Sequence, residues 1–155
     1  MQITFKKRQG KKHIITYQRE GKDLHWVDAD DFLILHDLSH YAIETNLGYT
    51  TAFWGMIKSG VDPEQFLVKE VRDRLFVSNE AWYAENMANL VLIEWSQGKF
   101  DDFNQVLNEV IQQTDSNLPP IELNEQQIID IRETYKKLVN QWEMLASDGQ
   151  MELKF

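Results

Sequence analysis

The stretch LHWVDADDFLILHDLSHYAIETNL, residues 24–47, contains the change of hydrophobic period that decides the fold. Its first four residues are typical of a short β-strand, whereas from Asp31 the pattern becomes that of a helix. Asp30 or Asp31 can cap this helix, which we expect to run to about Asn46, and Gly48 can provide a left-handed stop. The stretch therefore predicts a strand followed directly by a long helix.

Two further strands are predicted before this stretch, at residues 2–6 and 13–18. Both contain β-branched and aromatic residues, and the first alternates clearly between apolar and polar positions. Turn signals lie at Gln9-Gly10 and at residues 20–23. Short runs of this kind separated by glycine-containing turns indicate an antiparallel meander.

The last five residues, MELKF at 151–155, alternate as a strand in the same way as Ile3 and Phe5. An isolated strand of this length gains no stability in water. We therefore expect residues 151–155 to pair with the N-terminal sheet.

Between these strands the chain predicts helices joined by short loops. Asp62 and Pro63 make a good helix start, and Asn124 with Gln127 resembles a capping box. We expect helical segments at residues 50–59, 62–75 and 79–98, from 101 or 102 onward, and from 124 to a stop at Gly149, with a loop at 116–120. The predicted fold class is α+β, a single domain over residues 1–155. In it, a small antiparallel β-sheet from both chain termini packs on a mostly helical bundle.

Composition excludes several classes of site. The chain has 155 residues, the size of one ordinary domain, and its hydrophobic fraction of 43% can supply a core. It has no cysteine, which excludes disulfides, thiolate zinc sites, cysteine-ligated iron–sulfur clusters and a cysteine nucleophile.

Charge and hydropathy predict which partners the protein lacks. The net charge of −9 would repel a phosphate backbone, so we expect no nucleic-acid partner. The basic residues near the first turn are interpreted as the solvated tip of a hairpin. No run approaches the roughly 18 apolar residues that a membrane span needs. The N-terminal segment has no apolar core of a signal peptide, so we expect a cytoplasmic protein without a membrane partner.

A polar stripe on the helix of residues 31–47 is the candidate site. With His36 at zero on a helical wheel, His40 falls at about 40° and Glu44 at about 80°. Leu33 and Leu47 lie between the members of this stripe, and the opposite side is apolar. We therefore expect both histidines to be mostly buried, where each needs a partner because an unpaired buried polar group costs about 1–3 kcal/mol.

Histidines four residues apart on a helix can bind one metal ion, because their side chains project side by side. The segment His36-Asp37-Leu38-Ser39-His40 resembles the H-E-x-x-H motif of zinc peptidases. Asp37 replaces the glutamate that serves as general base in that motif, and it is one methylene shorter. The resemblance covers these five residues alone and implies zinc binding and hydrolysis.

A metal site would need a third protein ligand. Glu44 continues the stripe, but it lies two helical turns from His36, about 12 Å along the axis. An acid from the helix of residues 79–97 is more plausible, with Glu94 as first choice because it lies in an apolar face, and Glu85 as second. Two imidazoles and a carboxylate suit zinc, nickel, iron or manganese.

Two function hypotheses follow. In one, the protein is a small metal-binding protein, or a hydrolase, that uses the buried His36 and His40. In the other, it is a non-enzymatic binding or interaction domain, and the histidine stripe is a structural hydrogen-bond network. A metal-free binding or acid–base site is a third interpretation of the same residues. His13 and His25, which lie on strands, are interpreted as structural.

The helix that starts at Asn124 has an apolar seam with alternating spacings of three and four residues. Packing within the chain is favoured over a homodimer through residues 128–145, because the seam is shorter than four heptads. The members of the seam are Ile128, Ile131, Tyr135, Leu138, Trp142 and Leu145.

Overall fold

The computed structural model of the protein describes residues 1–22, 24–75, 77–114 and 117–155. Asp23, in the second predicted turn, and Ser116, in the predicted loop, lie outside the described residues. The strands are β1 (Gln2–Lys6), β2 (His13–Gln18), β3 (Leu24–Ala29) and β4 (Gln150–Lys154). The helices are α1 (Asp31–Leu47), α2 (Phe53–Ser59), the 3-10 helix η1 (Pro63–Leu67), α3 (Lys69–Leu75), α4 (Asn79–Gln97), α5 (Phe103–Thr114) and α6 (Glu125–Glu143).

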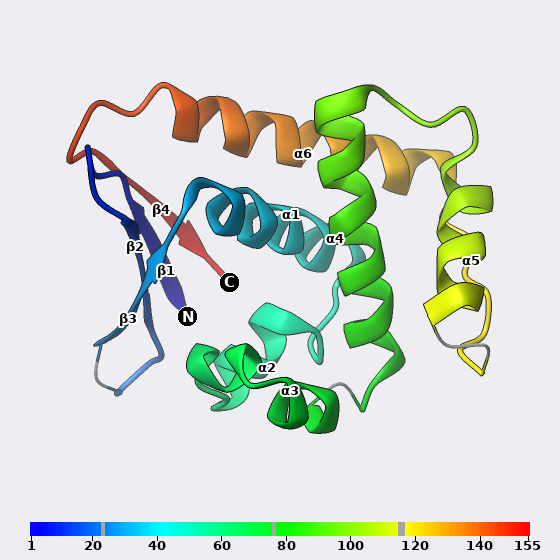
Figure 1. The fold of residues 1–155 in the computed structure, drawn as a ribbon, viewed down its shortest axis with the longest axis horizontal. Helices are drawn as coiled ribbons and strands as arrows, with labels where there is room; N and C mark the ends of the chain where they lie inside the picture. Colours follow the sequence, from blue (N-terminus) through cyan, green and yellow to red (C-terminus); the bar gives the residue numbers. More distant parts are fainter. Residues whose placement is uncertain (23, 76, 115–116) are drawn as a thin grey trace.

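The sheet is built from both ends of the chain, as predicted. Its strand order is β3-β2-β1-β4, and all neighbouring strands are antiparallel. In the pairing of β1 with β4, Ile3 lies opposite Leu153 and Phe5 opposite Met151. The Met1 amino group donates to the Phe155 carbonyl oxygen at 2.8 Å, so the two termini close one end of the sheet (Figure 1).

Helix α1 lies at the centre of the fold, between the sheet, α2, α4 and α6 (Figure 1). The Asp30 side chain accepts from the Leu33 N–H, and Gly48 ends the helix with φ 68°, both as predicted. From Leu33 to Glu44 no side chain of α1 is exposed. Polar groups that are buried on this part of α1, such as His40 and Glu44, therefore need partners inside the protein.

The seam of α6 packs against α1 within the same chain. Four of its members are buried: Ile131, Tyr135, Leu138 and Trp142. Helix α6 ends at Glu143, earlier than the predicted stop at Gly149. The Lys7 ammonium donates to the Trp142 and Glu143 carbonyl oxygens, which have no partner within the helix at its C-terminus. Backbone hydrogen bonds from Lys7 to Gly149 and from Asp148 to Lys7 then direct the chain into β4.

The single helix predicted at residues 62–75 is wrong. The chain forms η1, then an extended residue, Val68, with φ −98° and ψ 109°, and then α3. The capping box of Asp62 and Gln65 is present, but it starts a 3-10 turn, and such turns rarely continue beyond a few residues. The segment predicted from Thr50 becomes helical only at Phe53, because the Thr50 and Thr51 N–H groups donate to the Glu80 carboxylate.

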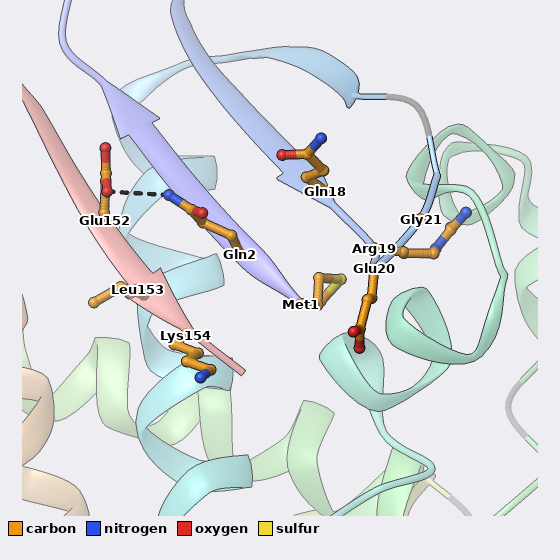
Figure 2. Close-up of a pocket in the computed structure, with 9 residues that line it drawn as sticks. All are labelled: Met1, Gln2, Gln18, Arg19, Glu20, Gly21, Glu152, Leu153 and Lys154. Carbon is orange, nitrogen blue, oxygen red and sulfur yellow. Dashed lines mark hydrogen bonds between the residues drawn. The ribbon is translucent and has the colours of Figure 1, made fainter.

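A shallow groove of about 640 Å3 lies where the termini meet (Figure 2). Gln2 of β1 donates to the Glu152 carboxylate of the adjacent strand β4 at 3.0 Å, and Arg19, Glu20 and Gly21, which follow β2, also line the groove. None of its lining residues belongs to the histidine stripe. In the described part of the chain, each helix is too short or too polar to cross a lipid bilayer.

Replacement of Met151 by alanine tests the role of β4. Met151 is 2% exposed, so the change should lower the free energy of unfolding by about 2–5 kcal/mol through lost apolar burial and a cavity. The neighbouring Gln150→Ala, at an exposed position of the same strand, should change it by less than about 0.5 kcal/mol. Equal, small effects of both changes in urea denaturation would show that β4 is not part of the shared core.

Candidate metal centre

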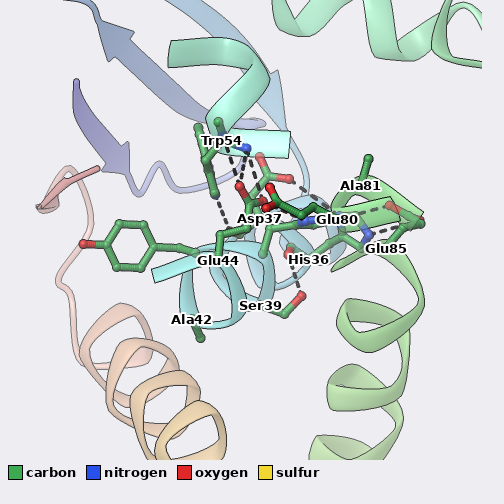
Figure 3. A network of polar contacts seen from close by, with 12 residues as sticks. His36, Asp37, Ser39, Ala42, Glu44, Trp54, Glu80, Ala81 and Glu85 are labelled. Atoms are coloured by element: carbon green, nitrogen blue, oxygen red, sulfur yellow. Dashed lines mark hydrogen bonds and ion pairs between the residues drawn. The ribbon is translucent and has the colours of Figure 1, made fainter. Parts of the chain in front are cut away.

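Helices α1 and α4 bring His36, His40 and Glu85 together. Figure 3 shows His36 and Glu85 within the network of polar contacts at this point. The distance from His40 Nε2 to Glu85 Oε2 is 3.3 Å, and that from His36 Nε2 to Glu85 Oε1 is 3.7 Å. One potential ligand atom from each of the three residues lies within 4.8 Å of the other two. A single metal ion could bind all three side chains at this point.

The other ring nitrogen of each histidine faces a buried carboxylate. His40 Nδ1 lies 3.2 Å from Glu44 Oε1, and His36 Nδ1 lies 3.6 Å from Asp37 Oδ1. A proton on Nδ1 of each ring would leave the Nε2 lone pair free on the side of Glu85. Metal-binding histidines in proteins are commonly oriented in this way by a carboxylate behind the ring.

Glu44 is held by more than His40. Its carboxylate accepts from the Trp54 N–H at 3.0 Å and from the Gly55 N–H at 3.1 Å. These are N–H groups of the first turn of α2, a helix that has no side-chain cap of its own. Glu44, which belongs to α1, therefore caps the N-terminus of α2 and orients the His40 ring. It is not one of the three clustered residues that could bind a metal ion.

Asp37 is buried, and its Oδ1 atom has no hydrogen bond. Its Oδ1 atom lies 3.6 Å from His36 Nδ1. Burial raises the pKa of Asp37, and the neighbouring His36 and His40 oppose this effect. This position, behind the His36 ring, suits a residue that orients the imidazole.

A cavity of about 240 Å3 adjoins the cluster. His36, Asp37 and Glu85 line it, so two of the three clustered residues border this cavity. Its other lining residues are Val27, Asp28, Leu33, Phe53, Pro63, Phe66 and Arg72.

The charges of the cluster are strongly coupled in the metal-free protein. Burial lowers the pKa of His40, but the hydrogen bonds and negative charges of Glu44 and Glu85 outweigh it and raise the pKa to about 10. Burial also lowers the pKa of His36, whereas Asp37 and Glu85 raise it, and the net shift is upward. For Glu85, burial raises the pKa, but the two histidines reverse this and hold it well below its usual range.

The three histidines of α1 and β2 differ in exposure and in partners. His40 is buried, with a side chain 1% exposed, and the His36 side chain is 17% exposed, so both are mostly inaccessible as predicted. His13 Nε2 lies 2.9 Å from Asp31 Oδ1, and its Nδ1 accepts from the Arg8 N–H, so both ring nitrogens have partners outside the cluster.

Glu94, the first choice for a third ligand, does not lie with the histidines. Its carboxylate forms an ion pair with Arg132 of α6 and accepts from the Phe100 N–H at 2.9 Å. It is nine residues from Glu85 along α4, about 13 Å of helical rise. Glu94 is buried, as its apolar surroundings in the sequence suggested, but on the side of α4 that meets α6.

Glu85, the second choice, lies in the cluster. On the sequence it belongs to a polar stripe of α4, and Asn89 donates to its Oε1 at 3.1 Å. The stripe was visible in the sequence, but its orientation toward the histidines depends on how α4 crosses α1.

Comparison with protein-family models, with curated proteins and with solved structures finds no match. The functional argument therefore rests on the geometry of this chain.

The pKa of His40 leads to a testable pH dependence in chelator-treated protein. The pKa of His40 is raised from 6.5 to about 10, so protonated His40 stabilises the folded state. This contribution to the free energy of unfolding is complete below pH 6.5 and is lost as the pH rises toward about 10. The lowered pKa of Glu85 acts in the opposite direction, and its contribution is lost as the pH falls below about 4.5.

We therefore expect His40→Gln to destabilise the metal-free protein most between about pH 4.5 and 6.5, and progressively less toward pH 10. Urea denaturation of parent and variant at a series of pH values measures this difference. A difference that stays constant from pH 6.5 to 10 would contradict a charged His40 held between two carboxylates.

Proposed function

We propose that the protein binds a divalent transition metal ion through His36, His40 and Glu85. One observation carries the proposal. Both histidines direct Nε2 toward the Glu85 carboxylate, while Nδ1 of each faces a buried carboxylate, Asp37 or Glu44. Metal-binding histidines commonly have a carboxylate behind the ring, and this arrangement occurs two times on α1.

The donor set indicates which metals fit. Two neutral imidazoles and one carboxylate suit zinc, nickel, iron or manganese. Three protein ligands leave coordination positions open, which is the pattern of sites that bind a substrate or water rather than of closed structural sites. The adjoining cavity supports this interpretation, since a small molecule could enter there.

The position of Asp37 bears on the resemblance to the peptidase motif. In H-E-x-x-H enzymes the second residue of the motif acts as the general base. Here Asp37 Oδ1 lies on the Nδ1 side of His36, the side opposite the Nε2 atom that faces Glu85. The geometry supports Asp37 as the residue that orients His36, and the proposal concerns metal binding rather than peptide hydrolysis.

A structural hydrogen-bond network is the competing function for the same residues. It is supported by the two partners of His40 in the metal-free protein, Glu44 at 3.2 Å and Glu85 at 3.3 Å. A protonated His40 between these carboxylates would stabilise the packing of α1 against α4 without any metal. The two functions differ in whether a metal displaces that proton.

Titration of tag-free, chelator-treated protein with zinc, nickel, iron(II) and manganese tests the proposal. We expect at least one metal to bind at one ion per chain with a Kd below about 1 µM, a free energy of about −8 kcal/mol. The double variant His36→Gln/His40→Gln should abolish binding. Asp37→Asn, which removes the acid behind His36, should weaken it by about 10–100-fold.

Two control variants separate the cluster from other candidates. His25→Gln removes a histidine that stacks on Tyr17 in the sheet, and Glu94→Gln removes the acid paired with Arg132. Both should bind metal like the parent, once circular dichroism shows that they are folded. Binding no tighter than about micromolar in the parent, for all four metals, would leave the structural network as the function of the cluster.

A further inference from the structure

Strand β3 forms one edge of the sheet, because the order β3-β2-β1-β4 leaves one of its sides without a neighbour (Figure 1). The hydrogen bonds show which residues face that side. Met1 and Phe155 exchange hydrogen bonds, so the odd-numbered residues of β1 bond to β4. Successive residues of a strand direct their N–H and C=O groups to opposite sides. Through the pairing of β1 with β2 and of β2 with β3, the even-numbered residues of β3 therefore face the free edge.

These residues are Leu24, Trp26 and Asp28. Within the described ranges, their backbone N–H and C=O groups have no hydrogen-bond partner. Leu24 and Trp26 are also 58% and 59% exposed. Edge strands of natural proteins are commonly protected by lysine, proline or a β-bulge. The strand sequence LHWVDA has neither lysine nor proline, and its pairing with β2 has no bulge, so β3 can accept another strand.

The sequence around β3 complements itself in one antiparallel register. A two-fold axis at His25 places Leu24 opposite Trp26 of a second copy of the chain. It also places Lys22 opposite Asp28 of the second copy. The symmetry produces each of these pairs twice. Apolar side chains therefore meet apolar side chains, and opposite charges meet on the same face of the sheet.

The two charged residues are available for this contact. Lys22 is exposed and has no ion pair within the described ranges. Asp28 binds Arg8 through Oδ1 at 2.8 Å, but its side chain remains 46% exposed. Oδ2 of Asp28 can therefore accept from Lys22 of the second copy while Oδ1 keeps its contact with Arg8.

Neighbouring registers lack this complementarity. With the axis at Trp26, Leu24 would lie opposite Asp28 of the second copy. With the axis at Leu24, Lys22 would lie opposite Trp26 of the second copy. In both registers a charged residue faces an apolar one, which is less favourable than the pairs formed about His25. The complementarity of β3 with itself favours a second copy of this chain as the partner.

We infer that two copies of the chain associate through β3, which pairs antiparallel with β3 of the second copy about a two-fold axis at His25. The two four-stranded sheets would then form one continuous sheet. Each copy contributes a single strand, so the interface is small and the dimer belongs to the weak, reversible class. The contact does not involve His36, His40 or Glu85, and it is independent of the proposed metal site.

Sedimentation velocity at a series of protein concentrations tests the association. The parent should form dimers with a Kd below about 100 µM. Lys22→Glu and Asp28→Lys each place like charges opposite one another in both pairs, so each should weaken the dimer at least about fivefold. An equimolar mixture of the two variants can form a heterodimer in which both pairs have opposite charges. The mixture should therefore associate at least about fivefold more tightly than either variant alone.

A cysteine at the two-fold axis tests the register. The chain has no cysteine, so a single introduced thiol can pair only with that of a second copy. Residues that face each other across the axis at position 25 form a non-hydrogen-bonded pair, with Cβ atoms roughly 4.5–5.5 Å apart, close to the spacing in a disulfide. Under mild oxidation, His25→Cys should form at least about fivefold more disulfide dimer than Leu24→Cys, although Leu24 is the more exposed position.

Each outcome decides the inference. A parent protein that stays monomeric up to about 500 µM would overturn it. So would a mixture of the charge variants that associates no more tightly than either alone, or equal crosslinking at positions 24 and 25. Circular dichroism checks that every variant is folded, and sedimentation of the parent still decides the inference if one of them is not.

Discussion

The buried carboxylate of Glu44 on α1 contacts α2 directly and α4 through His40, and the candidate site depends on these contacts. It accepts hydrogen bonds from two N–H groups at the start of α2 and lies 3.2 Å from Nδ1 of His40 on its own helix. A buried carboxylate without such partners would cost several kcal/mol. With them, it fixes the first turn of α2 and the orientation of the His40 ring, whose Nε2 then meets Glu85 of α4.

The burial of α1 explains why these polar groups are informative. The sheet, α4 and α6 cover the middle of the helix, and Ile34, Leu38 and Ala42 are completely buried. An apolar residue at position 37 or 40 would avoid the desolvation of a carboxylate or an imidazole there. Natural proteins depart from such local preferences mainly at functional or strained sites. In the described part of the chain, the Oδ1 atom of Asp37 is one of two buried side-chain polar atoms without a hydrogen bond, together with the Tyr135 hydroxyl.

Much of the fold could be predicted from the sequence because its signals are local. The alternation of MELKF matched that of Ile3 and Phe5, and the Asp30 cap with Gly48 bounded α1. The break at Val68 and the early end of α6 could not be predicted, because each depends on distant groups or on fine backbone geometry. Lys7, for example, caps a helix that ends 136 residues later in the chain.

Only the part of the candidate site that lies on α1 could be predicted from the sequence. The spacing of His36 and His40 and their interleaving with leucines are properties of a single helix, and both histidines are mostly inaccessible as expected. The choice between Glu85 and Glu94 required knowledge of which face of α4 meets α1 and which meets α6. Arg132, 38 residues beyond Glu94, pairs with that acid, and helical periodicity does not contain such information.

The central claim, that His36, His40 and Glu85 bind one metal ion, is tested most directly by anomalous X-ray scattering from crystals grown with stoichiometric zinc. The account predicts one anomalous peak, within about 2.0–2.2 Å of Nε2 of both histidines and of a Glu85 oxygen, with Asp37 and Glu44 still behind the rings. A fully occupied peak elsewhere on the chain, or no peak while His40 remains hydrogen-bonded between Glu44 and Glu85, would contradict it.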